Sequence, residues 1–378
     1  MRCQAVCPTD AIQLDAGQPL LDPERCVHCG LCLNHCPTDV FSEFPFPEQT
    51  LLVTAATRPG EAIVLLCALH PAPAQPALPV HLVIQHRRCL AALSIDQCLA
   101  LSQKGERTVW LDDRPCVDCP IGRAHETLLA TVQAANQLLT AFQRPPAIHL
   151  VTQKDTPTTA KPGKVTVLDG AQPPVSRRAL FGRLRQFANE AAKTLEANMS
   201  SATGADLPVA ERLPHRVPPS RQRLNQQIEA IAPAPSTELV TTTLPFAQVV
   251  VNHAACSACE LCSRFCPTGA LDLVKDSNYF TLQFTPRLCI DCGICAQACP
   301  EDAIAFGTSI PTPALTETTG QPMVTGSLQR CKKCGTVMAI RPGDAQGSYC
   351  YACRPAVSSN RPSASAVRRN LFDRLAGK

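Results

Sequence analysis

The chain has 378 residues, of which 45% are hydrophobic and only 4% aromatic, and it contains 35 prolines and 23 cysteines. This mixture indicates small compact modules joined by Pro-rich connectors rather than one large globule. A formal net charge of +4 without a basic, aromatic-rich patch argues against a nucleic-acid partner, and no apolar run approaches the ~20 residues of a membrane span.

Most of the cysteines stand in C-x-x-C runs, which aim neighbouring sulfurs at one point. That arrangement suits a metal and disfavours long-range disulfides. Because such thiolates persist in a reducing compartment, we expect the protein in the cytoplasm.

The first module, at residues 1–45, is dominated by a cysteine run that begins at Cys26 and reads C-VH-C-GL-C-LNH-C-P. C-x2-C-x2-C-x3-C-P is the bacterial cluster signature, in which the fourth cysteine binds the other cluster of the pair. Residues 3–8 read C-QAV-C-P, the last half of the same run, so we expect two cysteines of this motif upstream of Met1. The alternative is a one-cluster descendant that lost two ligands. Cys26, Cys29, Cys32 and Cys7 complete one site, and Cys3 and Cys36 form half of another.

Residues 50–153 change to an α/β pattern. Short apolar runs rich in β-branched residues predict strands at 63–67, 80–85, 109–112 and 147–151. A capping box that starts at Ser94 predicts a helix to about residue 104, and apolar spacing predicts another over 122–142. Strands that alternate with helices indicate a parallel sheet.

The cysteines of this middle domain follow its predicted strands. Since carboxyl ends of parallel strands form one edge where ligands bind, we expect four thiols to converge there: Cys67, Cys89, Cys116 and Cys119. Cys98 lies inside the predicted helix and is expected in the core.

On these cysteines, with Arg88 before Cys89, the stretch at about 60–143 weakly resembles a known iron–sulfur subunit. It is the small subunit that links methanogen-type hydrogenases to heterodisulfide reductase. The resemblance implies a cysteine-held cluster, although only one cysteine stands at Cys67. Three interpretations stay open: a metal cluster, a redox dithiol at Cys116 and Cys119, and inert thiols.

Residues 154–245 are rich in Pro, Thr, Ala and Gln, and we expect a mostly flexible linker with one helix at 176–197. Residues 247–307 then carry two complete cysteine runs around short predicted strands at 270–274, 279–284 and 303–306. This unit closely resembles the two-cluster bacterial ferredoxins. The resemblance implies a pseudo-symmetric β-hairpin and helix unit that transfers electrons. The signature assigns one site to Cys256, Cys259, Cys262 and Cys299, and the other to Cys289, Cys292, Cys295 and Cys266.

After an expected linker at 308–327, residues 328–356 contain two C-x2-C knuckles that resemble a zinc ribbon, with Cys331, Cys334, Cys350 and Cys353 as ligands. We expect a structural or docking role for it. The basic tail, 357–378, holds a second copy of an octapeptide: residues 177–184 read RRALFGRL and residues 368–375 read RRNLFDRL. These copies are candidate helical docking peptides, or a chance match of two basic turns.

The expected fold class is therefore multidomain α+β: two ferredoxin-like units flank an α/β parallel-sheet domain, with a zinc ribbon and flexible linkers. We expect three complete [4Fe-4S] sites, a fourth if the N-terminus extends upstream, a possible further cluster in the middle domain, and zinc. No nucleotide-binding fingerprint is present. The sequence thus predicts an electron-transfer subunit or partner of a larger oxidoreductase complex. The alternative is a cluster-driven disulfide or thiol reductase that uses Cys116 and Cys119.

Overall fold

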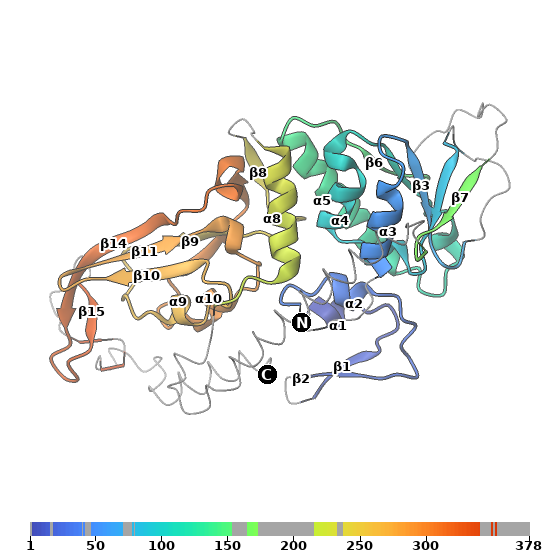
Figure 1. Cartoon of the computed structure of the whole chain (residues 1–378). Helices are drawn as coiled ribbons and strands as arrows, with labels where there is room; N and C mark the ends of the chain where they lie inside the picture. Colours follow the sequence, from blue (N-terminus) through green and yellow to red (C-terminus); the bar gives the residue numbers. More distant parts are fainter. Residues whose placement is uncertain are drawn as a thin grey trace, which may run out of the picture.

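The computed structural model describes residues 2–15, 18–39, 41, 47–70, 78, 80–152, 165–172, 215–232, 237–340, 349–350 and 352–353. The predicted helix at 176–197, both octapeptide copies and the whole basic tail at 357–378 lie outside these residues. Figure 1 shows an α/β domain and a C-terminal unit on either side of helix α8, with the N-terminal unit below the α/β domain. Within the described part of the chain, no helix is both long enough and apolar enough to cross a bilayer.

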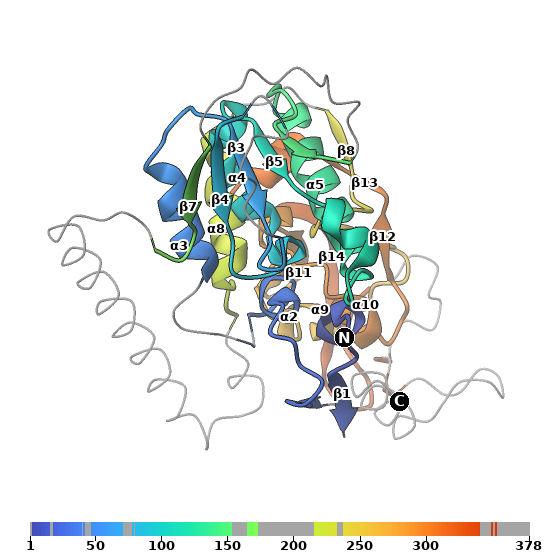
Figure 2. The same cartoon turned by 90° about the vertical axis from the view of Figure 1, so that its right-hand side faces the viewer.

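The middle domain contains the predicted parallel sheet. Its strand order is β6-β5-β3-β4-β7, and every neighbouring pair is parallel. The strands are β3 (Ile63–Leu66), β4 (Leu82–Gln85), β5 (Val109–Leu111), β6 (Ile148–Leu150) and β7 (Thr166–Asp169) (Figure 2). β3 and β5 are buried along their whole length, as both faces of such a sheet are covered. β7 lies in the range expected to be linker; it pairs with β4 at the sheet edge, where a short, half-exposed strand leaves a weak sequence signal.

Helices cover one face of this sheet. They are α3 (Pro47–Ala56), α4 (Ile95–Leu101) and α5 (Ala124–Ala141), with 3₁₀ turns η1 (Leu90–Ala92), η2 (Gln103–Gly105) and η3 (Arg114–Asp118). The predicted capping box at Ser94 is present: the backbone N–H of Ser94 donates to the side chain of Gln97, 2.9 Å away. Alternate strand residues such as Leu65 and Ile84 pack against these helices in the largest core.

The C-terminal unit has the hairpin-and-helix form expected of a ferredoxin. Its elements are β9 (Gln248–Val251), α9 (Leu261–Arg264), β10 (Leu271–Lys275), β11 (Tyr279–Phe284), η4 (Pro286–Leu288), α10 (Ile294–Ala298) and β12 (Ile304–Gly307). β10 pairs with β11, and β9 pairs with β12, both antiparallel. The N-terminal unit repeats this plan with α1 (Arg2–Val6), β1 (Ile12–Asp15), β2 (Gln18–Leu21) and α2 (Leu31–Asn34).

The range 308–327 is not the simple linker that we expected. It contains β13 (Ser309–Pro311), η5 (Thr312–Leu315) and most of β14 (Gln321–Arg330). β14 extends the ferredoxin hairpin, and β15 (Val337–Ala339) follows it, so the sheet runs β10-β11-β14-β15. Without β14, the edge of β11 would present unpaired backbone N–H and C=O groups; β14 forms hydrogen bonds with these groups.

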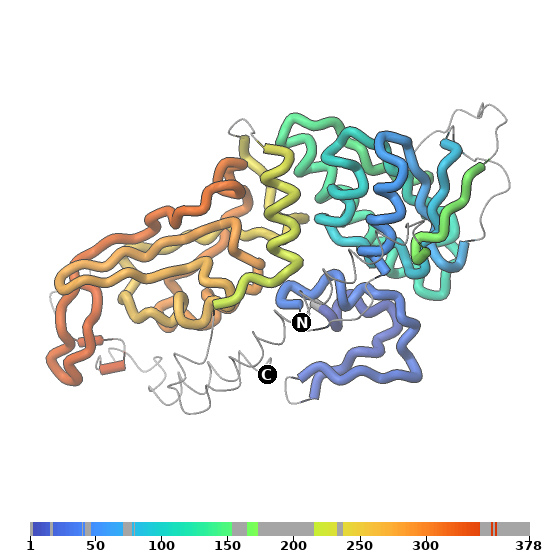
Figure 3. The backbone as a smooth tube through the Cα atoms, in the orientation of Figure 1, coloured from blue at the N-terminus to red at the C-terminus, as the bar shows by residue number. Residues whose placement is uncertain are grey.

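Helix α8 (Pro219–Ile231) and strand β8 (Glu238–Val240) also lie in the expected linker, 154–245. Leu224, Ile228 and Ile231 keep helical spacing and are buried in the large core of the middle domain. The tube in Figure 3 shows α8 between the two larger units. The sequence signal for α8 was weak because its three apolar residues stand among Pro, Gln and Arg. They are buried only because neighbouring units pack against them.

Candidate functional site

The three complete cysteine runs share one backbone conformation. The second residue after the first cysteine is left-handed in each run, and so is the residue directly after the second cysteine. These residues and their φ angles are His28 (50°), Ala258 (52°), Asp291 (52°), Gly30 (86°), Glu260 (67°) and Gly293 (72°). Residues other than glycine adopt this conformation at a cost of roughly 1–2 kcal/mol. Turns of this kind direct successive backbone N–H groups into a concave nest that binds anions, including iron–sulfur clusters.

The fourth cysteine of each run lies in a second repeated arrangement. The third residue beyond it is left-handed again, at Asp10, Asp39, Gly269 and Asp302. The backbone N–H of Ala11 donates to Cys7 Sγ at 3.2 Å, and that of Ala303 donates to Cys299 Sγ at 3.3 Å. Burial alone would raise the pKa of Cys7, but hydrogen bonds from Thr9 and the backbone lower it. Hydrogen bonds of this kind stabilise a thiolate and tune the potential of a bound cluster.

In the C-terminal unit, the structure brings together the two cysteine sets that the signature assigns. Cys256, Cys259, Cys262 and Cys299 line one small apolar cavity. In the other set, the pKa of Cys295 is raised to about 12, mainly by burial and in part by the thiols of Cys289, Cys292 and Cys266. Thiols so crowded stay protonated unless a cation replaces their protons, and a metal deprotonates a ligating thiol outright. Both sets therefore fit a metal cluster.

The N-terminal unit contains one comparable set. The pKa of Cys32 is raised to about 11, mainly by burial and in part by the neighbouring thiols of Cys29, Cys26 and Cys7. Cys3 and Cys36 are both buried. Cys36 Sγ lies 3.5 Å from the hydroxyl of Thr38, which repeats the contact between Cys7 and Thr9. The half-site thus keeps the local geometry of a fourth-cysteine loop.

In the middle domain, the thiols at the strand ends lie in the wall of one cavity of about 470 Å³. They are Cys67, Cys89, Cys116 and Cys119. Burial raises the pKa of Cys116 to about 12, with contributions from Cys89, the Asp113 carboxylate, Cys67 and Cys119. Cys98 is fully buried in α4, as expected, and does not line this cavity. The arrangement can hold a cluster, or it can present the Cys116–Cys119 dithiol.

Sequence reasoning did not place the N-terminal unit against this cavity. Cys29 lines it together with the middle-domain thiols. Leu31 is fully buried in the middle domain's core, and His35 Nε2 lies 3.0 Å from the carbonyl of Ala91. Arg123 bonds to the Cys7 carbonyl and to the Asp10 carboxylate. The available signal for this contact was Leu31, the apolar residue directly before the third cysteine of the run, but the local sequence does not indicate which surface it packs against.

A buried ion pair supports the same interface. Arg88 lies beside Gly30, and its Nη1 donates to Glu48 Oε1 at 3.2 Å. His86 Nε2 lies 3.7 Å from the same oxygen. Burial raises the pKa of Glu48, but His86 and the Arg88 charge outweigh it, so that the pKa is lowered.

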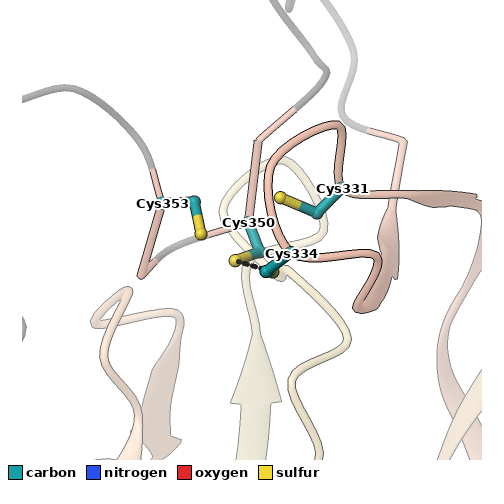
Figure 4. Close-up of side chains that lie close together, drawn as sticks. All are labelled: Cys331, Cys334, Cys350 and Cys353. Carbon is teal, nitrogen blue, oxygen red and sulfur yellow. Dashed lines mark hydrogen bonds between the residues drawn. The ribbon is translucent and has the colours of Figure 1, made fainter.

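The four ribbon cysteines form a tighter group than the cluster sets. Figure 4 shows Cys331, Cys334, Cys350 and Cys353 together, and their sulfurs all lie within 4.8 Å of one another. Zn–S bonds of about 2.3 Å in a tetrahedron put sulfurs about 3.8 Å apart, so this group fits a single ion. A backbone hydrogen bond from Cys350 is the main reason that the pKa of Cys331 is lowered to about 6. Elsewhere in the described ranges, no group of three or more metal-binding side chains is as compact.

Comparison with known proteins agrees with the geometry of the cysteine runs. The family model described as a 4Fe-4S dicluster domain matches residues 1–40 and 255–303. One component of the Na(+)-translocating ferredoxin:NAD(+) oxidoreductase complex of Acetobacterium woodii is 35% identical over 66 residues, 17% of this chain and 20% of that protein. An uncharacterized ferredoxin of Methanocaldococcus jannaschii is 51% identical over 35 residues, 9% of this chain and 23% of its own length.

The similarity thus spans only about a fifth of the length of these two relatives. No solved structure gives a significant match. A second uncharacterized ferredoxin of M. jannaschii is 33% identical over 57 residues, which are 15% of this chain but 74% of that protein. With nearly three quarters of a small ferredoxin covered, the chain belongs to the ferredoxins with 4Fe-4S dicluster domains.

Proposed function

We propose that this chain is an electron carrier that relays electrons through three [4Fe-4S] clusters. One is held by Cys256, Cys259, Cys262 and Cys299, one by Cys289, Cys292, Cys295 and Cys266, and one by Cys26, Cys29, Cys32 and Cys7. The observation that carries the proposal is the left-handed backbone that recurs at the same two positions of the three loops, a geometry that directs backbone N–H groups into an anion-binding nest.

A bound cluster of this type supplies one-electron chemistry. The residues around it hold the cluster, set its potential and exclude water. Ala258 and Ala298 are almost fully buried beside the ligands, and Leu282 and Phe284 close the apolar side of the sites. Backbone amides such as that of Ala303 donate to the sulfurs and favour the reduced, more negative state.

The donor and acceptor are proposed to be redox proteins, and the chain to be a subunit or partner of a larger oxidoreductase. The relative from A. woodii, itself a component of such a complex, supports this. The repeated octapeptides at 177–184 and 368–375 remain candidate docking segments, and the cytoplasm remains a prediction. We assign zinc to the ribbon, where it would stabilise the fold of a small module.

Iron analysis with a matched pair of cysteine variants tests the proposal. Anaerobically reconstituted protein should contain at least about twelve iron atoms and as many sulfides, four for each cluster. Cys259→Ser should lose about four of each and one electron paramagnetic resonance (EPR) signal. Cys98→Ser changes a buried thiol outside every set and should lose none. A colourless preparation, or equal iron in the two variants, would contradict the proposal.

The middle-domain cavity supports a fourth cluster or, as a second candidate function, disulfide reduction. The convergence of four thiols favours a cluster. The pairing of Cys116 and Cys119 before Pro120 favours a dithiol, whose disulfide would take two electrons and two protons, the electrons coming from the clusters. The double variant Cys116→Ser/Cys119→Ser separates the two. Lost iron supports the cluster, whereas full iron content with lost thiol reductase activity supports the enzyme.

A further inference from the structure

The cavity of the middle domain has a fifth cysteine in its wall, and that cysteine belongs to another unit. Cys29, the second cysteine of the N-terminal run, lines this cavity together with Val27 and His28. The thiol of Cys29 is among the groups that raise the pKa of Cys89. A proposed cluster ligand and a proposed middle-domain ligand therefore line the same cavity.

The interface between the N-terminal unit and the middle domain is tightly packed. Gly30 lies against Arg88, whose guanidinium is fixed by Glu48. Leu31 is buried among middle-domain residues, and no part of its side chain meets solvent. The position of Cys29 in the cavity wall is thus set by a shared hydrophobic core.

The C-terminal ferredoxin does not line this cavity. None of the described residues that line the cavity comes from the range 247–307. The second cluster loop of the C-terminal unit, at Ile290 and Asp291, instead lines a separate cavity of about 300 Å³ together with Cys36 of the N-terminal unit and Ser94 and Thr127 of the middle domain.

Helix α8 holds that second junction in place by contacts to all three units. The backbone N–H of Ser220 donates to Asp39 of the N-terminal unit at 2.8 Å. Arg223 Nε donates to Asp96 of the middle domain at 3.0 Å. Asn225 donates to the carbonyl of Arg287 in the C-terminal unit at 3.2 Å. The two ferredoxin units and the middle domain therefore all contact α8, through residues that do not line the middle-domain cavity.

We infer that the N-terminal unit is an electron relay between the C-terminal ferredoxin and the middle-domain site, with Cys29 as the point of exchange. The inference rests on the proposed function. With clusters bound, the centre held by Cys7, Cys26, Cys29 and Cys32 would give up one electron, and the centre held by Cys67, Cys89, Cys116 and Cys119 would accept it, with no bond made or broken.

Spin relaxation in the full-length, anaerobically reconstituted and reduced protein tests the relay. The EPR signal of the middle-domain centre is identified by its loss in Cys116→Ser/Cys119→Ser. The variant Cys26→Ser/Cys32→Ser removes the N-terminal cluster and leaves Cys29 in the cavity wall. Its middle-domain signal should lose its fast-relaxing component, because the neighbouring electron spin is gone.

The matched control is Cys256→Ser/Cys262→Ser, which removes the distant C-terminal cluster and should leave that component intact. Should either variant fail to fold, the unaltered protein is measured at a potential that oxidises, and so silences, the N-terminal cluster alone. Unchanged relaxation without the N-terminal spin, or an equal change in the control, overturns the inference. The inference is also overturned if the ferredoxin clusters are intact but the middle domain holds no redox-active iron; in that case the proposed function still stands. A protein that contains no iron overturns both the inference and the proposed function.

Discussion

Alanine substitutions at two equivalent glycines would show how tightly the N-terminal cluster loop is packed on the middle domain. Gly30 and Gly293 hold the same position in their cysteine runs and have left-handed φ angles of 86° and 72°. A Cβ at Gly293 would meet nothing within 4 Å. A Cβ at Gly30 would lie 2.9 Å from Arg88 Cδ and 3.2 Å from Ala92 Cβ.

The expected magnitudes follow from these surroundings. Both variants force alanine into the left-handed region, which costs roughly 1–2 kcal/mol. The loss of conformational freedom in the unfolded chain offsets about 0.4–1 kcal/mol of this cost, so Gly293→Ala should cost about 0–1.6 kcal/mol. Gly30→Ala adds overpacking, typically about 1–3 kcal/mol, because Arg88 is buried and bonded to Glu48 and cannot move aside freely.

Native-state hydrogen exchange on the reconstituted protein measures both effects locally. Amides of Leu31–Asn34 should lose protection in Gly30→Ala by about 5- to 150-fold more than amides of Ile294–Ala298 lose in Gly293→Ala, since about 1.4 kcal/mol corresponds to tenfold. Equal losses in the two variants would refute the reasoning, because the approach of Arg88 to the loop would then have no energetic consequence.

Three further results are expected. Glu48→Gln removes the carboxylate from the buried ion pair with Arg88 and should lower the free energy of unfolding by about 3–5 kcal/mol. The pKa of Glu48 is lowered on folding, so its ionised carboxylate stabilises the fold above its ordinary pKa of about 4.5. This stabilisation is lost as the pH falls through the folded pKa, and the free energies of unfolding of the two proteins should therefore converge at low pH. Leu31→Ala should cost about 2–5 kcal/mol in urea unfolding, and Leu261→Ala, at the equivalent but half-exposed position, clearly less. Chelation of the ribbon's zinc should raise hydrogen exchange at the amide of Ala339, which donates to the Ser257 carbonyl at 3.1 Å, and leave loop 289–295 unchanged.

Much of the candidate site could be predicted because its geometry is local. Three cysteines at x2 spacing can surround one point whatever lies beyond them, and the structure gives all three runs the same turns. The strand-end positions of Cys67, Cys89 and Cys116 were also predictable, since parallel strands end at a common edge. Parallel pairing itself followed from apolar runs that alternate with helices.

The missed elements are those whose burial depends on distant surfaces. β14 is a mixed polar strand, and it forms because the edge of β11 offers hydrogen bonds. β7 is half-exposed and is held by pairing with β4. Helix α8 carries its three buried apolar residues among polar ones, and only the packing of neighbouring units makes that stripe sufficient.

By itself, the sequence determined that the first three sulfurs of each run gather, because the chain between them is too short to separate them. The tertiary structure alone decided that Cys29 shares a cavity with Cys89 and that Leu31 joins the core of another domain. Those contacts link residues about 60 positions apart in the chain, and their free energy comes from apolar area that neither segment can bury alone.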